Sequence, residues 1–146
     1  INRKTYYMGR FLNHAWQPDW KLRVAKKAAK PEWDGYNPHD ILKINGPIKN
    51  LRGDLYHYSY KNLEDHFCRT VKYAKLSAQS YFKKEKKFRW HKVLLNPISA
   101  FAKVYFMQLG FLDGYRGLIV AVSSFTYTFL KYIFLWEIER NNEQHL

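Results

Sequence analysis

The chain has 146 residues, 47% of them hydrophobic and 18% aromatic, and a formal net charge of +13 at pH 7. It is too apolar for a disordered polybasic tail and too basic for an ordinary cytosolic enzyme, which indicates one folded domain, or a piece of one, with an anionic partner. Phosphates of nucleic acid, of lipid headgroups and of phosphorylated saccharides all fit this charge.

Basic residues are concentrated in the first two thirds of the chain. Residues 1–60 hold 11 Lys/Arg against 5 Asp/Glu, residues 61–103 hold 11 against 3, and residues 104–146 hold 3 against 4. Since no repeat or low-complexity segment is present, we interpret these zones as parts of one architecture. The single cysteine, Cys68, excludes an internal disulfide and a thiolate cage for a metal.

Residues 1–60 predict short strands and loops, because proline and glycine interrupt the aromatic and β-branched residues too often for a long helix. The better strand candidates are residues 41–44 and residues 54–58. Asn45-Gly46, between apolar runs, predicts a tight turn between strands.

A helix is predicted from about Asn62 to residue 84. The Asn62 side chain is a suitable N-cap, and Asp65 follows three residues later in an arrangement like a capping box. Apolar residues then recur every three or four positions and predict one buried stripe. The stripe consists of Leu63, Phe67, Val71, Ala74, Ala78 and Tyr81.

The helix runs into a basic cluster, residues 83–92, in which Phe88 and Trp90 are embedded among lysines and arginine. Aromatic rings within a cationic run suit a headgroup interface, where the rings lie at the boundary and the charges meet phosphate. The alternative interpretation is a solvated helix end.

From residue 93 to residue 136 the chain is dominated by apolar residues. Pro97 predicts the first turn of a new helix, and Gly110, Gly114 and Gly117 predict a break. Residues 117–136 approach the length of about 20 residues that spans a bilayer, but Lys131 and several hydroxyls favour helices that lie in the interface. A transmembrane helix and a simple core helix are the alternatives.

Short motifs occur in a characteristic order along nearly the whole chain. They are Tyr7-Met8-Gly9-Arg10, Trp16-Gln17-Pro18-Asp19, Lys21-Leu22-Arg23-Val24, Trp33-Asp34-Gly35, Pro38-His39-Asp40, residues 51–60, Arg69, Tyr73-Ala74, Gly110-Phe111-Leu112-Asp113-Gly114 with Gly117, Lys131-Tyr132 and Leu135-Trp136-Glu137. In order and spacing these motifs resemble the family-2 glycosyltransferases that build lipopolysaccharide core.

The resemblance implies the fold class and the division of the chain. We expect an α+β structure in which residues 1–60 are the acceptor-side part of a GT-A catalytic domain, residues 61–92 a basic amphipathic helix, and residues 93–146 apolar C-terminal helices that anchor at the membrane interface. The sequence contains no Asp-x-Asp motif before a strand and no glycine-rich turn for a diphosphate. The donor-binding half is therefore expected upstream of Ile1, and the chain alone is expected to be inactive.

Asp40 is the catalytic residue that the resemblance implies. Inverting transfer needs a base that takes the proton from the acceptor hydroxyl, and a carboxylate beside the acceptor pocket suits that role. The family usually has His-Glu where this chain has His39-Asp40, which is one methylene shorter. His39 is expected to bind substrate. Without the resemblance, Asp40 after Pro38 would be interpreted as a helix or turn cap.

His57 is implied as a ligand for a divalent metal beside the diphosphate, with Mn²⁺ accepting nitrogen more readily than Mg²⁺. The alternative is a hydrogen-bonded structural histidine. Trp16, Asp19 and Arg23 are expected to shape the substrate cleft, because an aromatic ring stacks on a sugar face and arginine pairs with phosphate. For Trp16 a place in the core is the alternative. His14, His66 and His91 receive no role.

The expected partners are a nucleotide-sugar donor, a lipid-linked saccharide acceptor and an anionic membrane surface, with self-association of the isolated chain and no nucleic acid. The expected location is the cytoplasmic face of the inner membrane, with peripheral or monotopic attachment. Two alternatives remain: a basic nucleic-acid-binding module, which explains the charge but not the apolar last third, and a non-catalytic membrane anchor, which leaves residues 1–60 without a role.

Overall fold

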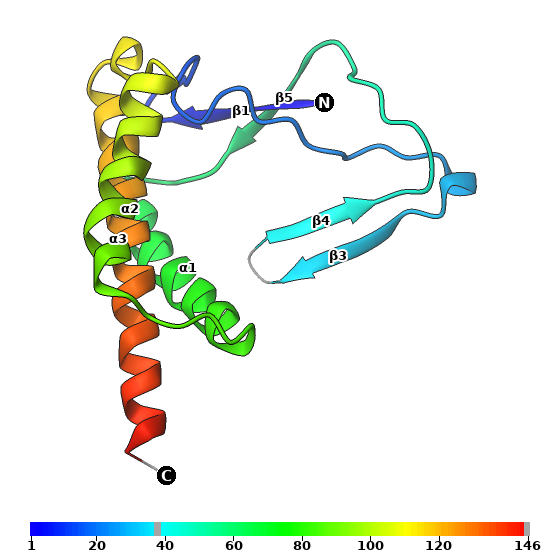
Figure 1. Cartoon of the computed structure of the whole chain (residues 1–146). Coiled ribbons are helices and arrows are strands. Elements are labelled where there is room, and N and C mark those ends of the chain that lie inside the picture. Colours follow the sequence, from blue (N-terminus) through cyan, green and yellow to red (C-terminus); the bar gives the residue numbers. More distant parts are fainter. Residues whose placement is uncertain (37–38, 145–146) are drawn as a thin grey trace.

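The computed structural model describes residues 1–36 and 39–144, without the side chains of residues 35, 36, 39 and 40. The strands precede the α-helices along the chain, which confirms the α+β prediction (Figure 1). The elements are β1 (Asn2–Tyr7), β2 (Arg10–Phe11), β3 (Glu32–Tyr36), β4 (His39–Lys43), β5 (Asp54–Tyr58), α1 (Leu63–Lys83), α2 (Trp90–Ala102) and α3 (Tyr115–Glu143).

The strands form one sheet of order β2–β1–β5 and a separate β3–β4 hairpin. β1 and β5 are parallel, with Asn2 opposite Asp54 and Tyr6 opposite Tyr58. Both predicted strands are present, but the predicted tight turn at Asn45-Gly46 is wrong: these residues form a bend after β4. β4 pairs antiparallel with β3, the strand before it in the chain. β5 pairs in parallel with β1, and a parallel pair requires a long crossover connection and not a tight turn.

β1 was not predicted because its sequence is mostly polar. Thr5 and Tyr7 are nevertheless buried, and they alternate with residues that are more exposed, as expected for a strand covered on one face. The strand forms because β5 supplies its hydrogen-bonding partner from 52 residues farther along the chain.

α1 begins as predicted. The Asn62 side chain accepts a hydrogen bond from the backbone N–H of Asp65 at 2.8 Å, while the Asp65 carboxylate accepts from the Lys61 N–H at 3.1 Å. Ala74 and Ala78 of the predicted stripe are buried, whereas Leu63 and Val71 are exposed. The rest of the buried face is polar, consisting of His66, Thr70 and Ser77, because partners on β1 and α3 satisfy two of these side chains.

α2 begins at Trp90, so the prediction that Pro97 occupies a first turn is wrong. Pro97 lies inside the helix and is buried. A π-helical turn, Lys103–Met107, extends α2, and a 3-10 helix, Gly110–Asp113, leads to α3. Gly110 and Gly114 lie at this break as predicted, but Gly117 lies within α3.

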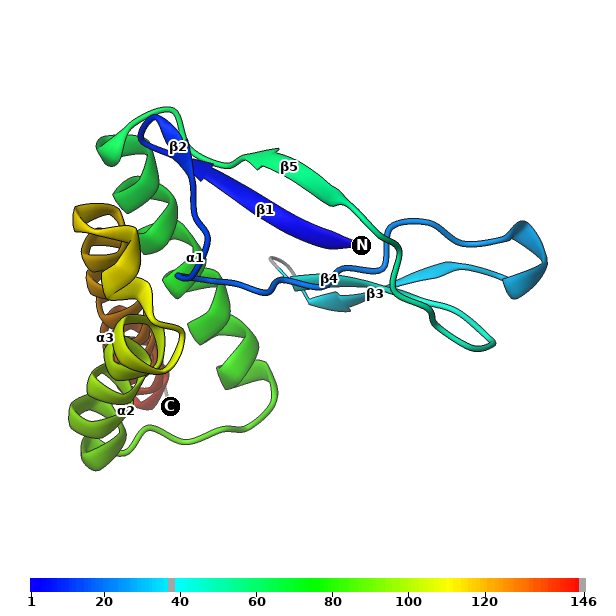
Figure 2. The ribbon, with the colours of Figure 1, turned by 90° about the horizontal axis from the view of Figure 1, so that it is seen from above.

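α3 packs against both α1 and α2, and α1 lies on the side of the bundle that faces the β3–β4 hairpin (Figures 1 and 2). Hydrogen bonds join the helices: Ser77 with Tyr127 at 2.6 Å, and Asn96 with Tyr132 at 2.6 Å. Several hydroxyls of α3, which in the sequence favour an interfacial helix over a transmembrane one, donate hydrogen bonds to carbonyls of the same helix. The Thr128 hydroxyl, for example, donates to the Ser124 carbonyl.

The N-terminal strands are fastened to the helices by one hydrophobic cluster and one carboxylate. The cluster joins Tyr7, Leu12 and Ala15 to Val104, Val120 and Ala121. The buried carboxylate of Asp113 accepts hydrogen bonds from the backbone N–H groups of residues 13, 14 and 15 at 3.0, 2.9 and 2.8 Å. These contacts hold the loop after β2, and with it one wall of the cavity described below, against the helices.

Candidate functional site: a polar cavity between the sheet and α1

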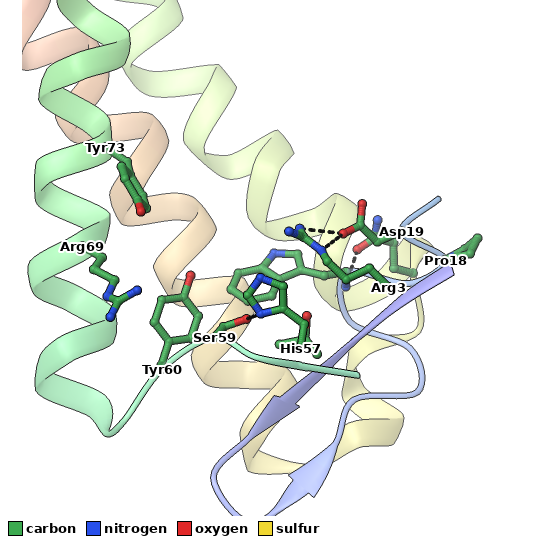
Figure 3. Close-up of a pocket in the computed structure, with 11 residues that line it drawn as sticks. Arg3, Pro18, Asp19, His57, Ser59, Tyr60, Arg69 and Tyr73 are labelled. Atoms are coloured by element: carbon green, nitrogen blue, oxygen red, sulfur yellow. Dashed lines mark hydrogen bonds and ion pairs between the residues drawn. The ribbon is translucent and has the colours of Figure 1, made fainter. Parts of the chain in front are cut away.

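A cavity of about 530 Å³ lies between the β1–β5 sheet and α1 (Figure 3). Its volume falls within the range of roughly 300–1,000 Å³ that is usual for small-molecule sites. The lining side chains come from β1, the loop before residue 20, β5 with the residues after it, α1 and the end of the π-helical turn. They are Arg3, Thr5, Trp16, Pro18, Asp19, His57, Ser59, Tyr60, Arg69, Tyr73 and Gln108.

Parallel pairing explains how the sheet reaches the cavity. Thr5 and His57 lie opposite each other in the register of β1 and β5, so both side chains leave the sheet on the same face. Arg3 lies two residues before Thr5, and Ser59 two residues after His57, so the alternation of strand side chains places these residues on that face as well.

Arg3 and Asp19 form the ion pair of the cavity. The Arg3 Nε–H and one terminal amino group each lie 2.7 Å from the same carboxylate oxygen of Asp19, and the Lys21 ammonium lies 3.0 Å from the other. The backbone is joined here too, because the Arg3 N–H donates to the Asp19 carbonyl at 2.9 Å. Asp19 therefore holds Arg3 at the cavity wall.

His57 is a neutral imidazole at pH 7. Burial, and then the positive charge of Arg3, lower the pKa of His57 below its usual value of 6.5. Its Nδ1 atom lies 2.8 Å from the Ser59 hydroxyl. If Nδ1–H donates to that hydroxyl, the Nε2 lone pair is left for a ligand; if the hydroxyl donates, Nε2 carries the proton.

Trp16 is held in an unusual backbone conformation at the cavity. Its φ angle of 59° lies in the left-handed region, which costs a bulky residue on the order of 1 kcal/mol. The Trp16 N–H donates to the Gln108 side-chain oxygen at 3.0 Å, and the indole N–H donates to the Ser124 hydroxyl at 3.3 Å. Trp16 packs beside the hydrophobic cluster and also lines the cavity.

Several residues that line the cavity have no role predicted from the sequence. Arg69 and Tyr73 are one turn apart on α1, and Figure 3 shows both side chains on the cavity side of that helix with Tyr60 between Arg69 and the sheet. A helical wheel of α1 would have shown that residues 69 and 73 share a face. No sequence pattern would have shown that this face meets β1 and β5.

Of the expected site residues, the structure brings Trp16, Asp19 and His57 together and leaves Arg23 outside. The Arg23 guanidinium lies over the Trp33 ring, 5.5 Å from its centroid, beside a different and more apolar cavity. The backbones of His39 and Asp40 lie on β4, but their side chains are outside the described residues.

The metal prediction rests on His57 alone within the described part of the chain. No group of three His, Cys, Asp or Glu side chains that could hold an ion occurs among the described residues. Asp19, the acidic residue in the cavity lining, is already bound to Arg3 and Lys21.

Helix α3 is one feature that bears on membrane association. Within the described residues it alone has the length and apolar composition to cross a membrane, and 28% of its apolar window is buried.

No model of a known protein family matches the chain, and no solved structure matches it significantly.

Proposed function

We propose that the chain is the acceptor-side part of an inverting family-2 glycosyltransferase that transfers a hexose-type sugar from a nucleotide-sugar to a lipopolysaccharide-core or other lipid-linked glycan. The observation that carries this proposal is the shared cavity of Trp16, Asp19 and His57. Trp16 and Asp19 come from one motif of the resemblance and His57 from another, and their indole, carboxylate and imidazole suit a polar saccharide.

Asp40 is the proposed base. Its carboxylate would take the proton from the acceptor hydroxyl while that oxygen attacks the anomeric carbon and the bond to the nucleoside diphosphate breaks, with inversion at that carbon. Trp16 would stack on a sugar ring, and Asp19 would orient Arg3, which it holds at 2.7 Å. His39 would bind substrate from the same strand as Asp40, and Arg23 would contact substrate from outside the cavity.

A divalent metal, Mn²⁺ or Mg²⁺, belongs to the proposal through His57. The described residues do not complete a ligand set, so no step above depends on the metal. In the proposed complete enzyme, the remaining ligands would come from the donor-binding half and from the diphosphate.

Membrane association at the cytoplasmic face of the inner membrane completes the proposal. On α2, the side chains of Leu94, Leu95 and Ile98 are exposed. Exposure of apolar side chains to water is unfavourable, and burial in a lipid interface would remove this contact with water. Most of the basic cluster, residues 83–92, is exposed between the end of α1 and the start of α2, where its charges would meet lipid phosphate. These features support peripheral or monotopic attachment.

The test is sugar transfer by the chain joined to the donor-binding half that the resemblance predicts upstream of Ile1. Asp40→Asn should lower kcat by at least about 100-fold with little change in KM, because it removes the base and keeps the shape. Asp34→Asn is the matched control, since Asp34 is on the same hairpin and pairs with Lys43. Equal activity of wild type and Asp40→Asn would remove Asp40 from the mechanism, and no transfer by the wild type from any nucleotide-sugar would overturn the function.

A further inference from the structure

Arg69 presents a charged group to the cavity that no step of the proposed transfer uses. Its Nε–H donates to the Asp65 carboxylate at 2.8 Å, an i,i+4 pair along α1. Within the described part of the chain, its terminal amino groups have no hydrogen-bond acceptor. The side chain is 41% exposed, so the guanidinium keeps two donor groups available at the cavity wall.

The surroundings of Arg69 restrict where an anion would bind. Its guanidinium carbon lies 5.9 Å from the centre of the Tyr60 ring, which is itself stacked on the buried His66 at 4.2 Å. Tyr60 therefore has little freedom, and its ring lies beside the guanidinium within the range of a cation–π contact. Tyr73 lines the cavity one turn further along α1.

Across the cavity, the guanidinium of Arg3 is already paired with the carboxylate of Asp19. Both contacts of Arg3 with Asp19 are 2.7 Å long, which is the geometry of a strong charge-assisted pair. With His57 neutral, Arg69 is left as the lining cation whose terminal donors face no carboxylate among the described residues. Arginine with two free terminal donors matches phosphate oxygens.

We propose that Arg69 is a specificity-determining residue that binds a phosphate carried by the saccharide, while Trp16, Tyr60 and Tyr73 contact the sugar ring. The inference rests on the proposed function, because it names the substrate class of the same cavity: a phosphorylated sugar in preference to a neutral one. A cavity of about 530 Å³ is large enough for a phosphorylated hexose.

The test is a binding titration of the full chain, observed by NMR at the arginine Nε–H signals, with the Arg69 signal identified by its loss in Arg69→Gln. Three probes are compared: glucose 6-phosphate, glucose and inorganic phosphate. We expect glucose 6-phosphate to bind at least about tenfold more tightly than either of the others, because only it engages both the rings and the guanidinium.

Two variants separate recognition from structure. Arg69→Gln should weaken glucose 6-phosphate binding about tenfold and leave glucose binding unchanged. Asp65→Asn is the matched control, because it removes the ion pair and keeps the guanidinium, so it should bind glucose 6-phosphate at least as tightly as the wild type. Circular dichroism of both variants checks that α1 is intact.

The outcomes are distinct from those of the transfer assay, because the titration requires no catalysis. Equal binding of glucose and glucose 6-phosphate, or equal loss in Arg69→Gln and Asp65→Asn, would overturn the role of Arg69 while leaving sugar transfer untouched. Inorganic phosphate binding as tightly as glucose 6-phosphate would show an anion site without a saccharide, which also overturns the inference. Phosphosugar binding without any transfer would instead remove the glycosyltransferase function.

Discussion

His66 and Tyr7 form a buried polar pair behind the cavity. The Tyr7 hydroxyl lies 2.7 Å from His66 Nδ1, and the imidazole is enclosed by the rings of Tyr60, Trp16 and Phe67. Burial lowers the pKa of His66 to about 4, and burial followed by the neighbouring Tyr60 raises the pKa of Tyr7 to about 12. Both groups are neutral at pH 7, so the pair fixes Tyr60 at the cavity without a buried charge.

Protonation of His66 should destabilise the fold in mild acid. The folded pKa of about 4 is below the unfolded value of 6.5, so the unfolded state binds the extra proton and stability is lost as the pH falls through this window. The free energy of unfolding should be about 3 kcal/mol lower at pH 4 than at pH 7 from this group. Urea unfolding at both pH values measures it.

His66→Gln provides the comparison, because the amide can still bond to Tyr7 but does not titrate. Between pH 7 and pH 4, the free energy of unfolding of His66→Gln should fall less than that of the wild type. The two falls should differ by most of the about 3 kcal/mol expected from His66. Identical pH dependence of the two proteins would show that His66 is not the group responsible.

At the scale of elements, the approach of α3 to the loop before it depends on two glycines. A Cβ atom on Gly117 would lie 1.7 Å from the Gly110 carbonyl oxygen, and a Cβ on Gly110 would lie 2.5 Å from the Val104 carbonyl oxygen. The start of α3 therefore packs backbone against backbone on the 3-10 helix at Gly110, and Gly110 packs in the same way on the π-helical turn. This close packing also positions Asp113, whose carboxylate binds the loop that carries Trp16.

Gly117→Ala should cost at least about 3 kcal/mol of stability, because backbone atoms must separate to admit the methyl group. Chemical denaturation measures the change, and nuclear magnetic resonance would show signals of residues 13–16 shifting with it. Leu118→Ala is the control on the same turn, since Leu118 is exposed and its truncation should cost less than about 1 kcal/mol. Similar losses in the two variants would contradict the close-packing explanation.

At the scale of the whole molecule, the polar cavity and the proposed membrane surface lie on different parts of the molecule. The cavity lies between the sheet and α1, whereas α2 and α3 lie on the side away from the β3–β4 hairpin (Figures 1 and 2). A protein attached through α2 and the basic cluster would keep the cavity open to a lipid-linked acceptor.

Binding to vesicles tests this arrangement. The chain should co-sediment with vesicles containing anionic lipid, and part of the binding should survive high salt because apolar side chains contribute. Leu95→Glu on α2 should weaken binding about tenfold. Val71→Glu, at an exposed position on α1, is the control and should bind like the wild type. Salt-labile binding that nucleic acid competes away, with no retention on vesicles, would favour the nucleic-acid alternative.

The sequence by itself determined the elements whose signals are local. The start of α1 depends on Asn62 and its neighbour Asp65, and β5 depends on a short run of strand-forming residues, so both were predicted from nearby residues alone. The break before α3 follows from the same kind of local signal, the glycines at 110 and 114. Trp16, Asp19 and His57 were predicted as site residues from motifs, but no pattern of neighbouring residues indicates that they line the same cavity.

Only the tertiary structure decided the strand β1, the position of Pro97 and the set of cavity residues, because these features depend on which segments pack together. β1 exists as a strand through its pairing with β5, and Pro97 is accommodated within α2, where it is buried in the bundle. Arg69 and Tyr73 became cavity residues because their face of α1 meets the sheet, and Arg23 did not because its guanidinium lies over the Trp33 ring. Burial and charge environment are properties of contacts between distant segments, and a local pattern of residues does not contain them.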